Sequence, residues 1–112
     1  MSKIGLRFLE GRRFSDNRGF FEETYNKMTY GRLGLLDDFV QDNHSFSKQV
    51  NTLRGLHFQK PPAAQGKLVR CTRGEIFDVA IDIRLGSQTY GQWEGYVLSA
   101  ESAHQLYIPV GL

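Results

Sequence analysis

From residue 39 onward, short apolar segments recur about every ten residues and are separated by turn-forming residues such as Pro61-Pro62 and Arg73-Gly74. The expected strands, with one more near the N-terminus, cover residues 4–9, 39–46, 52–59, 67–72, 75–84, 93–99 and 105–108. Strands of this length at this spacing, with almost no helix between them, predict an antiparallel β-sandwich or barrel.

One short helix is expected before these strands. Asn26 can cap its first turn, because an Asn side chain accepts the backbone N–H groups that are free there. Gly34 can end it, since glycine readily adopts the left-handed conformation that follows many helices. The helix is therefore predicted to run from Asn26 to Arg32 or Leu33, which makes the fold class all-β with one short N-terminal helix.

Alternation is most regular in residues 75–84. One face carries Phe77, Val79, Ile81 and Ile83, and the other carries Asp78, Ala80, Asp82 and Arg84. One face belongs to the core, and the polar face either meets solvent or lines a cavity.

The adjacent Phe20 and Phe21 pose a related question, because neighbours on a strand point to opposite sides. One of them needs a cover, from a partner chain, a loop or a ligand.

Length and charge exclude several classes of protein. The 112 residues predict one domain, residues 1–112, near the size at which stability often comes from a partner chain. A net charge of +2 is too small for general nucleic-acid binding. The sequence shows neither the apolar core of a signal peptide nor a membrane span, so we expect a cytoplasmic protein. The single Cys71 excludes an internal disulfide and a cysteine-based zinc site.

Polar and titratable side chains are concentrated between residues 41 and 73, on segments that otherwise favour strands. They include Asn43, His44, Arg54, His57, Gln59 and Lys67. This density indicates either a functional interior or a solvated outer face of a sheet, and the residues alone leave both open.

Proton transfer combined with anion recognition is the chemistry that these residues favour. His57 suits a general base, because histidine is the side chain that most often transfers protons near neutral pH, and Asp78 or Asp82 on a neighbouring strand could orient its ring. Arg54 offers a planar fork for phosphate or carboxylate, and Lys67 offers a compact charge for a developing oxyanion.

The sequence lacks the residues that metal binding, nucleophilic hydrolysis or a phosphate-binding loop would require. His44, His57 and His104 do not assemble a convincing metal-ligand set, so no metal is expected. The sequence has neither a nucleophile elbow nor a phosphate-binding loop. Arg54 and His57 would point to opposite faces of an ideal strand, so Gly55 is expected to host a bulge between them.

Several runs of sequence carry a resemblance to a known family. They are QDNHSFS, TLRGLHFQ, AQGKLVRCTRGEIFDVAIDIRLGS, TYGQW, LSAE and QLYIPVG, together with DNRGFFEETYN. In order and spacing, from Phe14 to Gly111, they resemble the dTDP-4-dehydrorhamnose 3,5-epimerases. The resemblance implies a cupin-type jelly-roll barrel, either complete or incomplete. It also implies a role in dTDP-L-rhamnose biosynthesis, in which dTDP-4-dehydro-6-deoxy-D-glucose is inverted at C3 and C5 to dTDP-4-dehydro-L-rhamnose without a cofactor.

The resemblance also implies roles for single residues. His57 is similar to the family's base and Lys67 to the lysine near the C4 oxygen. The family's substrate-binding and nucleotide-binding residues are matched by Gln41, Asp42, Asn43 and Arg54, and by Arg18, Phe21 and Glu23. In the family the N-terminal segment is exchanged between two subunits, so a homodimer is expected.

The resemblance covers only the first part of the family's sequence pattern. Family chains continue past the Pro-x-Gly turn with Gly-Phe-Ala-His-Gly-Phe and further strands that carry the proton-donor tyrosine, whereas this sequence ends at Leu112. Its own Tyr90, Tyr96 and Tyr107 match other positions. Unpaired sheet edges and reduced turnover are therefore expected. The alternatives are a catalytically silent dTDP-sugar-binding or interaction module, and a related 3-epimerase or 3,4-ketoisomerase.

Overall fold

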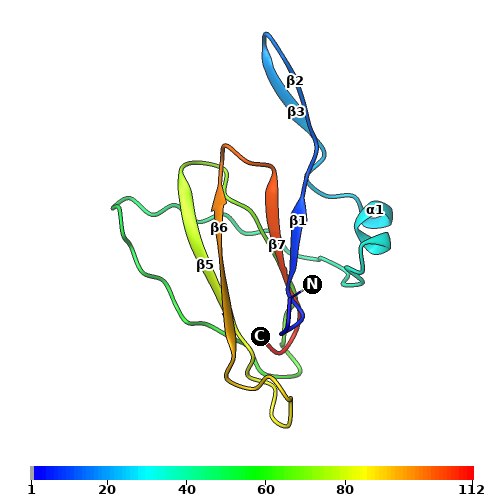
Figure 1. Cartoon of the computed structure of the whole chain (residues 1–112), viewed down its shortest axis with the longest axis vertical. Coiled ribbons are helices and arrows are strands. Elements are labelled where there is room, and N and C mark those ends of the chain that lie inside the picture. Colours follow the sequence, from blue (N-terminus) through cyan, green and yellow to red (C-terminus); the bar gives the residue numbers. More distant parts are fainter. Residues whose placement is uncertain (1) are drawn as a thin grey trace.

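The computed structural model describes residues 2–112, which form β-strands and one short helix (Figure 1). The elements are β1 (Arg7–Glu10), β2 (Arg13–Asp16), β3 (Gly19–Glu22), α1 (Lys27–Arg32), β4 (Lys67–Val69), β5 (Glu75–Ile81), β6 (Trp93–Ser99) and β7 (His104–Ile108). Within the described part they form three antiparallel sheets, ordered β1-β7-β4, β2-β3 and β5-β6. The all-β prediction is confirmed, although β1, β4 and β5 are shorter than predicted.

The hydrophobic core lies between the β1-β7-β4 sheet and the β5-β6 sheet. Its buried members are Ile4, Leu6, Ala80, Leu98, Leu106, Ile108 and Leu112. A second cluster covers the opposite face of the β1-β7-β4 sheet, where Tyr30 of α1 and Leu35 pack on Tyr107. β7 is therefore buried on both faces, which explains its continuous run of apolar residues.

The helix α1 has the ends that the sequence predicts. Asn26 Oδ1 accepts the backbone N–H groups of Met28 and Thr29, at 3.0 and 3.1 Å. Gly34, just after the C-cap Leu33, has φ +91, a conformation that residues with side chains rarely adopt. The N-cap and the terminating glycine are both confirmed.

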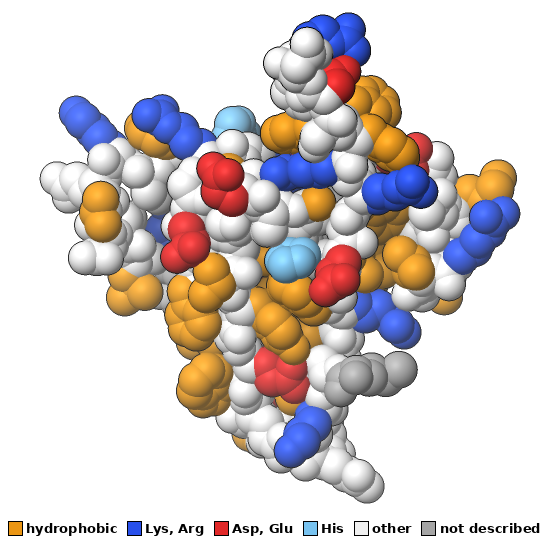
Figure 2. Space-filling model, turned by 45° about the horizontal axis from the view of Figure 1, so that its top comes forward, with side chains coloured by type: hydrophobic (Ala, Val, Ile, Leu, Met, Phe, Trp, Pro, Cys, Tyr) orange, Lys and Arg blue, Asp and Glu red, His pale blue; other side chains and the backbone are white. Residues whose placement is uncertain are grey.

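The strand β5 turns its polar face inward, which is the cavity-lining alternative. Ala80 is 5% exposed and packs in the core, whereas Phe77 on the apolar face is 64% exposed. The Phe77 ring lies over Gly95 of β6, where any side chain would collide with it. Figure 2 shows hydrophobic side chains gathered over this part of the surface. The inward polar face brings Asp78 into the interior between the sheets.

Two predicted strands, residues 39–46 and 52–59, are wrong. Both run along an excursion from the sheets, drawn in green in Figure 1, and we call residues 38–65 the arm. Neither segment has a strand partner among residues 2–112, and apolar side chains such as Leu53 and Phe58 are exposed there. Their composition favours strands, but a strand also needs a neighbour to pair with, which local sequence cannot supply.

The strands β2 and β3 form a hairpin that projects from the end of the sheets (Figure 1). Arg13 fixes its base, because the guanidinium binds Glu22 and donates to the carbonyl groups of the turn between β6 and β7. The same guanidinium lies 4.1 Å from the centre of the Phe20 ring. Phe20 and Phe21 are 56% and 72% exposed, so the chain buries neither ring, and Phe21 is the more exposed of the two.

Candidate active site

Lys67 and Asp78 face the space between the two sheets. Lys67 begins β4 opposite Ile108, and Asp78 lies on β5 opposite Tyr96. Directly paired residues of an antiparallel sheet share a face. Ile108 belongs to the core and Tyr96 packs against it. Both charged side chains therefore start from strand faces that are turned inward.

The Asp78 carboxylate is not fully satisfied by the protein. Among the residues described, its Oδ2 is the only fully buried side-chain oxygen or nitrogen without a hydrogen-bond partner. Burial raises the pKa of Asp78, while a hydrogen bond from the Val79 backbone N–H and the positive charge of Lys67 act in the opposite direction. An unpaired buried acceptor costs stability, and groups of this kind are typical of functional sites.

The carboxylate of Asp82 is occupied by hydrogen bonds within the connection from β5 to β6. Its fully buried carboxylate accepts hydrogen bonds from the N–H, Nε and NH2 groups of Arg84, each at 2.9 Å, and from the hydroxyls of Ser87 and Thr89, at 2.7 and 2.6 Å. Led by those from Arg84, these bonds outweigh burial and hold the pKa of Asp82 far below its usual range. They stabilise the connection from β5 to β6. Of the two acids predicted to orient His57, only Asp78 remains available.

His57 and Arg54 lie on the arm, and both are exposed. Arg54 donates to Ser47 Oγ at 3.0 Å and to the Phe46 carbonyl at 3.1 Å, which ties the two extended halves of the arm together. Gly55 has φ +105, but residues 52–59 form no strand, so the predicted β-bulge is wrong. Within residues 2–112, no hydrogen bond or ion pair joins His57 to Lys67 or Asp78.

The remaining predicted residues lie on the arm and the hairpin. The arm exposes Gln41, Asp42 and Asn43, and Gln41 donates to Asn43 at 3.0 Å. On and beside the hairpin, Arg18 pairs with Asp16 at 2.6 Å, and Glu23 accepts from Asn26 at 3.3 Å. The structure thus turns Lys67 and Asp78 toward the same interior, engages Asp82 in the connection from β5 to β6, and leaves the other predicted residues on two separate surfaces.

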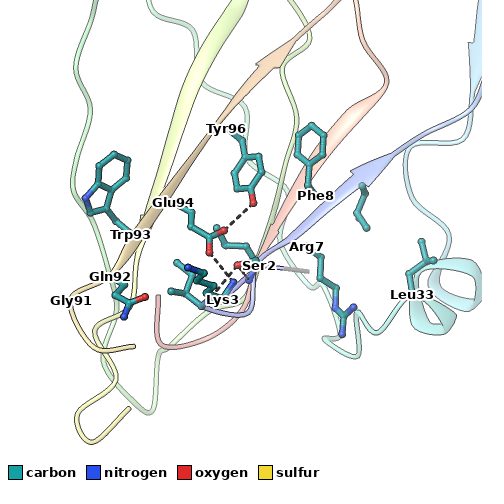
Figure 3. Close-up of a pocket in the computed structure, with 13 residues that line it drawn as sticks. Ser2, Lys3, Arg7, Phe8, Leu33, Gly91, Gln92, Trp93, Glu94 and Tyr96 are labelled. Atoms are coloured by element: carbon teal, nitrogen blue, oxygen red, sulfur yellow. Dashed lines mark hydrogen bonds between the residues drawn. The ribbon is translucent and has the colours of Figure 1, made fainter. Parts of the chain in front are cut away.

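A wide cleft of about 1050 Å³ opens between β1, β6 and the N-terminal residues (Figure 3). Its lining includes none of the predicted site residues. Glu94 accepts the backbone N–H of Lys3 and the hydroxyl of Tyr96, both at 2.9 Å. Burial alone would raise the pKa of Glu94, but hydrogen bonds from Ser2, Tyr96 and Lys3 lower it. This carboxylate is satisfied by the protein, in contrast to Asp78.

Sequence analysis missed one polar contact beside the site. The hydroxyl of Tyr107 on β7 donates to the carboxylate of Asp37, at the start of the arm. The two residues lie 70 positions apart, so no local pattern points to their contact.

Residues 2–112 contain no group of three potential metal-binding side chains. No helix in that range is long and apolar enough to cross a bilayer.

Comparisons with known proteins point to one family. The family model for dTDP-4-dehydrorhamnose 3,5-epimerase matches residues 3–112. The dTDP-4-dehydrorhamnose 3,5-epimerase of Salmonella typhimurium is 61% identical over 104 residues, which are 92% of this chain and 56% of that protein. The chain spans about half the length of the curated relatives it matches.

Solved structures agree. The enzyme of that name from Bacillus anthracis, with TDP and PPi bound, has a TM-score of 0.95 at 48% identity, over 99% of this chain and 64% of its own. A dTDP-6-deoxy-D-glucose-3,5-epimerase from Legionella pneumophila, in complex with dTDP-4-keto-L-rhamnose, has a TM-score of 0.92 at 50% identity, over 98% and 58%.

Proposed function

The chain belongs to the family of dTDP-4-dehydrorhamnose 3,5-epimerases, and from this membership we propose that it serves to invert C3 and C5 of dTDP-4-dehydro-6-deoxy-D-glucose. The product is dTDP-4-dehydro-L-rhamnose, and the chain acts as one cytoplasmic domain, residues 1–112. The cupin-type jelly-roll fold expected from the sequence is confirmed by the solved relatives. One observation carries the catalytic proposal. Lys67 and the partly unpaired carboxylate of Asp78 share the interior between the sheets.

The chemistry follows from the ketone at C4 of the sugar. Loss of the proton from C3 or C5 gives an enolate, whose negative charge lies largely on the C4 oxygen. His57 takes this proton as the general base. The ammonium group of Lys67 stabilises the oxyanion, and Asp78 keeps a negative charge near Lys67 so that its position is fixed. Return of a proton to the opposite face of the carbon completes each inversion. No cofactor is needed, because the substrate's own carbonyl stabilises the carbanion.

Substrate binding draws on the arm and the hairpin. On the arm, Arg54 offers a planar cation to the sugar nucleotide. Gln41 and Asn43 offer amide groups, and Asp42 offers a carboxylate. Arg18, Phe21 and Glu23 are offered by the hairpin, where Phe21 presents an exposed ring for a base or a partner chain. We infer a homodimer in which each hairpin reaches the site of the other subunit, since the hairpin projects away from its own sheets.

Proton exchange tests the function directly. Incubation of the protein with dTDP-4-dehydro-6-deoxy-D-glucose in heavy water should place deuterium at C3 and C5, as followed by NMR. The His57→Asn variant should lose this exchange, whereas His104→Asn, which changes a histidine that stacks on Phe8, should keep it. Exchange no faster than in buffer, from a folded sample, would remove the enzymatic proposal. Unchanged exchange in His57→Asn would show that another group is the base.

A second candidate is a catalytically silent module that binds dTDP-sugars. It is favoured by the arrangement of residues 2–112, because no hydrogen bond or ion pair there joins His57 to Lys67 or Asp78. Titration calorimetry with dTDP, run beside the exchange assay, separates the two candidates. Binding without exchange supports the silent module, and exchange at both carbons supports the epimerase.

A further inference from the structure

Three residues from distant parts of the sequence meet at the base of the arm. Asp37 precedes the arm, Gly66 follows it, and Tyr107 lies on β7. The Tyr107 hydroxyl donates to Asp37 Oδ2. A Cβ atom added to Gly66 would lie 2.7 Å from the same oxygen, closer than real Cβ contacts come. The Asp37 carboxylate therefore sits directly against Gly66, so the two ends of the arm meet at this carboxylate. We call these three residues the base clamp.

The base clamp is attached to the best-packed part of the fold. Tyr107 is 7% exposed, lies in the central strand of its sheet and packs with Tyr30 and Leu35. Its partner across the sheet is Leu68, the residue directly after Lys67. Burial, and after it the hydrogen bond to Asp37, raises the pKa of Tyr107 to about 12. At neutral pH the hydroxyl is therefore protonated and donates.

Other contacts between the described arm and the sheets are weaker. Asp38 pairs with Lys27 at 2.6 Å, but both side chains are about three-quarters exposed, and such ion pairs contribute little. The Arg73 guanidinium lies 5.7 Å from the centre of the Phe46 ring. Phe39 is partly buried beside the second cluster. Within residues 2–112, the bond from the Tyr107 hydroxyl to Asp37, directly before the arm, is the only side-chain hydrogen bond between the β1-β7-β4 sheet and either end of the arm.

We propose that Asp37, Gly66 and Tyr107 are positioning residues. They set the direction in which the arm leaves the β1-β7-β4 sheet, and thereby place His57 relative to Lys67. The catalytic consequence rests on the proposed function, since it assumes the roles of His57 and Lys67. The mechanical consequence does not, because it concerns only where the arm lies.

The position of the arm can be measured without any activity. Spin labels at Val50→Cys, in the arm, and Leu85→Cys, in the β5–β6 connection, occupy sites that are 90% and 89% exposed, in a Cys71→Ser background. Tyr107→Phe removes only the donating hydroxyl and should shift or broaden the distance distribution. Tyr96→Phe is the matched control, because it removes another tyrosine-to-carboxylate hydrogen bond, to Glu94, away from the arm. The same distribution in Tyr107→Phe and in the parent would overturn the proposal.

The close approach at Gly66 gives an independent test. Gly66→Ala introduces a methyl group into the space that the Asp37 carboxylate fills, so the arm should move. In an Asp37→Ala chain that space is free, and the added methyl group should have almost no further effect. Asp37→Asn keeps an acceptor for the Tyr107 hydroxyl and should preserve the parent distances. If Gly66→Ala shifts the spin-label distances equally in the parent and in the Asp37→Ala chain, the proposed base clamp is contradicted.

Kinetics then connect the clamp to catalysis. If the arm places His57, Tyr107→Phe should lower kcat for deuterium incorporation about 10- to 100-fold, as misplaced catalytic groups do, with KM within about twofold. A parent protein without exchange would sink the proposed function, while the spin-label distances would still decide the clamp. Displaced distances with unchanged kcat would overturn the catalytic consequence alone.

Discussion

Replacing Asp82 by alanine should be among the most costly single changes in this chain. Its carboxylate accepts five hydrogen bonds, three of them from Arg84, and the side chain is fully buried. Alanine would leave the hydroxyls of Ser87 and Thr89 and the Arg84 cation without their acceptor. Removing one partner of a buried ion pair costs about 3–5 kcal/mol. Arg84 is 43% exposed and can partly rehydrate, which favours the lower end, about 3 kcal/mol. At about 4 °C per kcal/mol, Tm should fall by about 12 °C.

The hairpin offers a matched control. Asp16 accepts from the N–H, Nε and NH2 groups of Arg18, just as Asp82 does from Arg84, two positions along the chain in both cases. The side chains of Arg18 and Asp16 are 86% and 48% exposed. Asp16→Ala should therefore leave the urea unfolding midpoint unchanged. Equal midpoint shifts for Asp16→Ala and Asp82→Ala, with equal slopes, would refute the claim that burial decides the strength of this arrangement.

The same carboxylate predicts a dependence on pH. Hydrogen bonds from Arg84, then from Thr89 and Ser87, keep the pKa of Asp82 far below its usual value of 3.8. In acid the unfolded chain therefore binds a proton at this site before the folded chain does. The stability that Asp82 contributes is complete well above pH 3.8 and is lost as pH falls below it. The difference in unfolding free energy between the parent and Asp82→Asn, from urea titrations, should shrink from pH 6 to pH 3. A constant difference would contradict the assignment.

Two further changes test the candidate site and the helix. Burial raises the pKa of Asp78, so ionisation destabilises the folded chain as pH rises from its unfolded pKa to its folded one. Asp78→Asn should therefore raise the free energy of unfolding at pH 7 but not near pH 3, while it slows deuterium incorporation. Asn26→Ala removes the acceptor for Met28 and Thr29 and should cost about 1 kcal/mol, whereas Asn26→Asp should cost almost nothing. If the urea unfolding midpoint of Asn26→Asp falls as far as that of Asn26→Ala, the cap is not what stabilises α1.

Local sequence predicted the features that depend on neighbouring residues. Asn26 and Gly34 mark the ends of α1 because a cap and a left-handed glycine act within one turn. The bounds of β6 were predicted correctly, since its segment lies between turns on both sides. Residues 39–46 and 52–59 have the same strand-like composition and yet form no strand, because pairing depends on a distant neighbour. The contact between Asp37 and Tyr107 was missed for the same reason.

The sequence proposes residues for the candidate site, but it does not predict how they are arranged. Alternation in β5 defined two faces, and only packing against Leu98 and Leu106 shows that the polar one lies inside. Asp78 and Asp82 are equivalent in that pattern, two positions apart. Arg84, Ser87 and Thr89 distinguish them, because they satisfy Asp82 and leave Asp78 with an unpaired oxygen.

The proposed catalytic groups differ in how they are held. Lys67 and Asp78 lie on strands whose backbones are paired and whose inner faces meet the core, so the group that stabilises the oxyanion is fixed by the fold itself. His57 and Arg54 lie on the arm, whose backbone has no strand partner within residues 2–112. Segments with few buried contacts open at low free energy. A ligand that touches both Lys67 and Arg54 must therefore hold the arm in place as it binds, and some of its binding free energy offsets that ordering. Ligands that contact only the hairpin avoid this cost, so dTDP alone should order the arm less than the complete keto sugar nucleotide does.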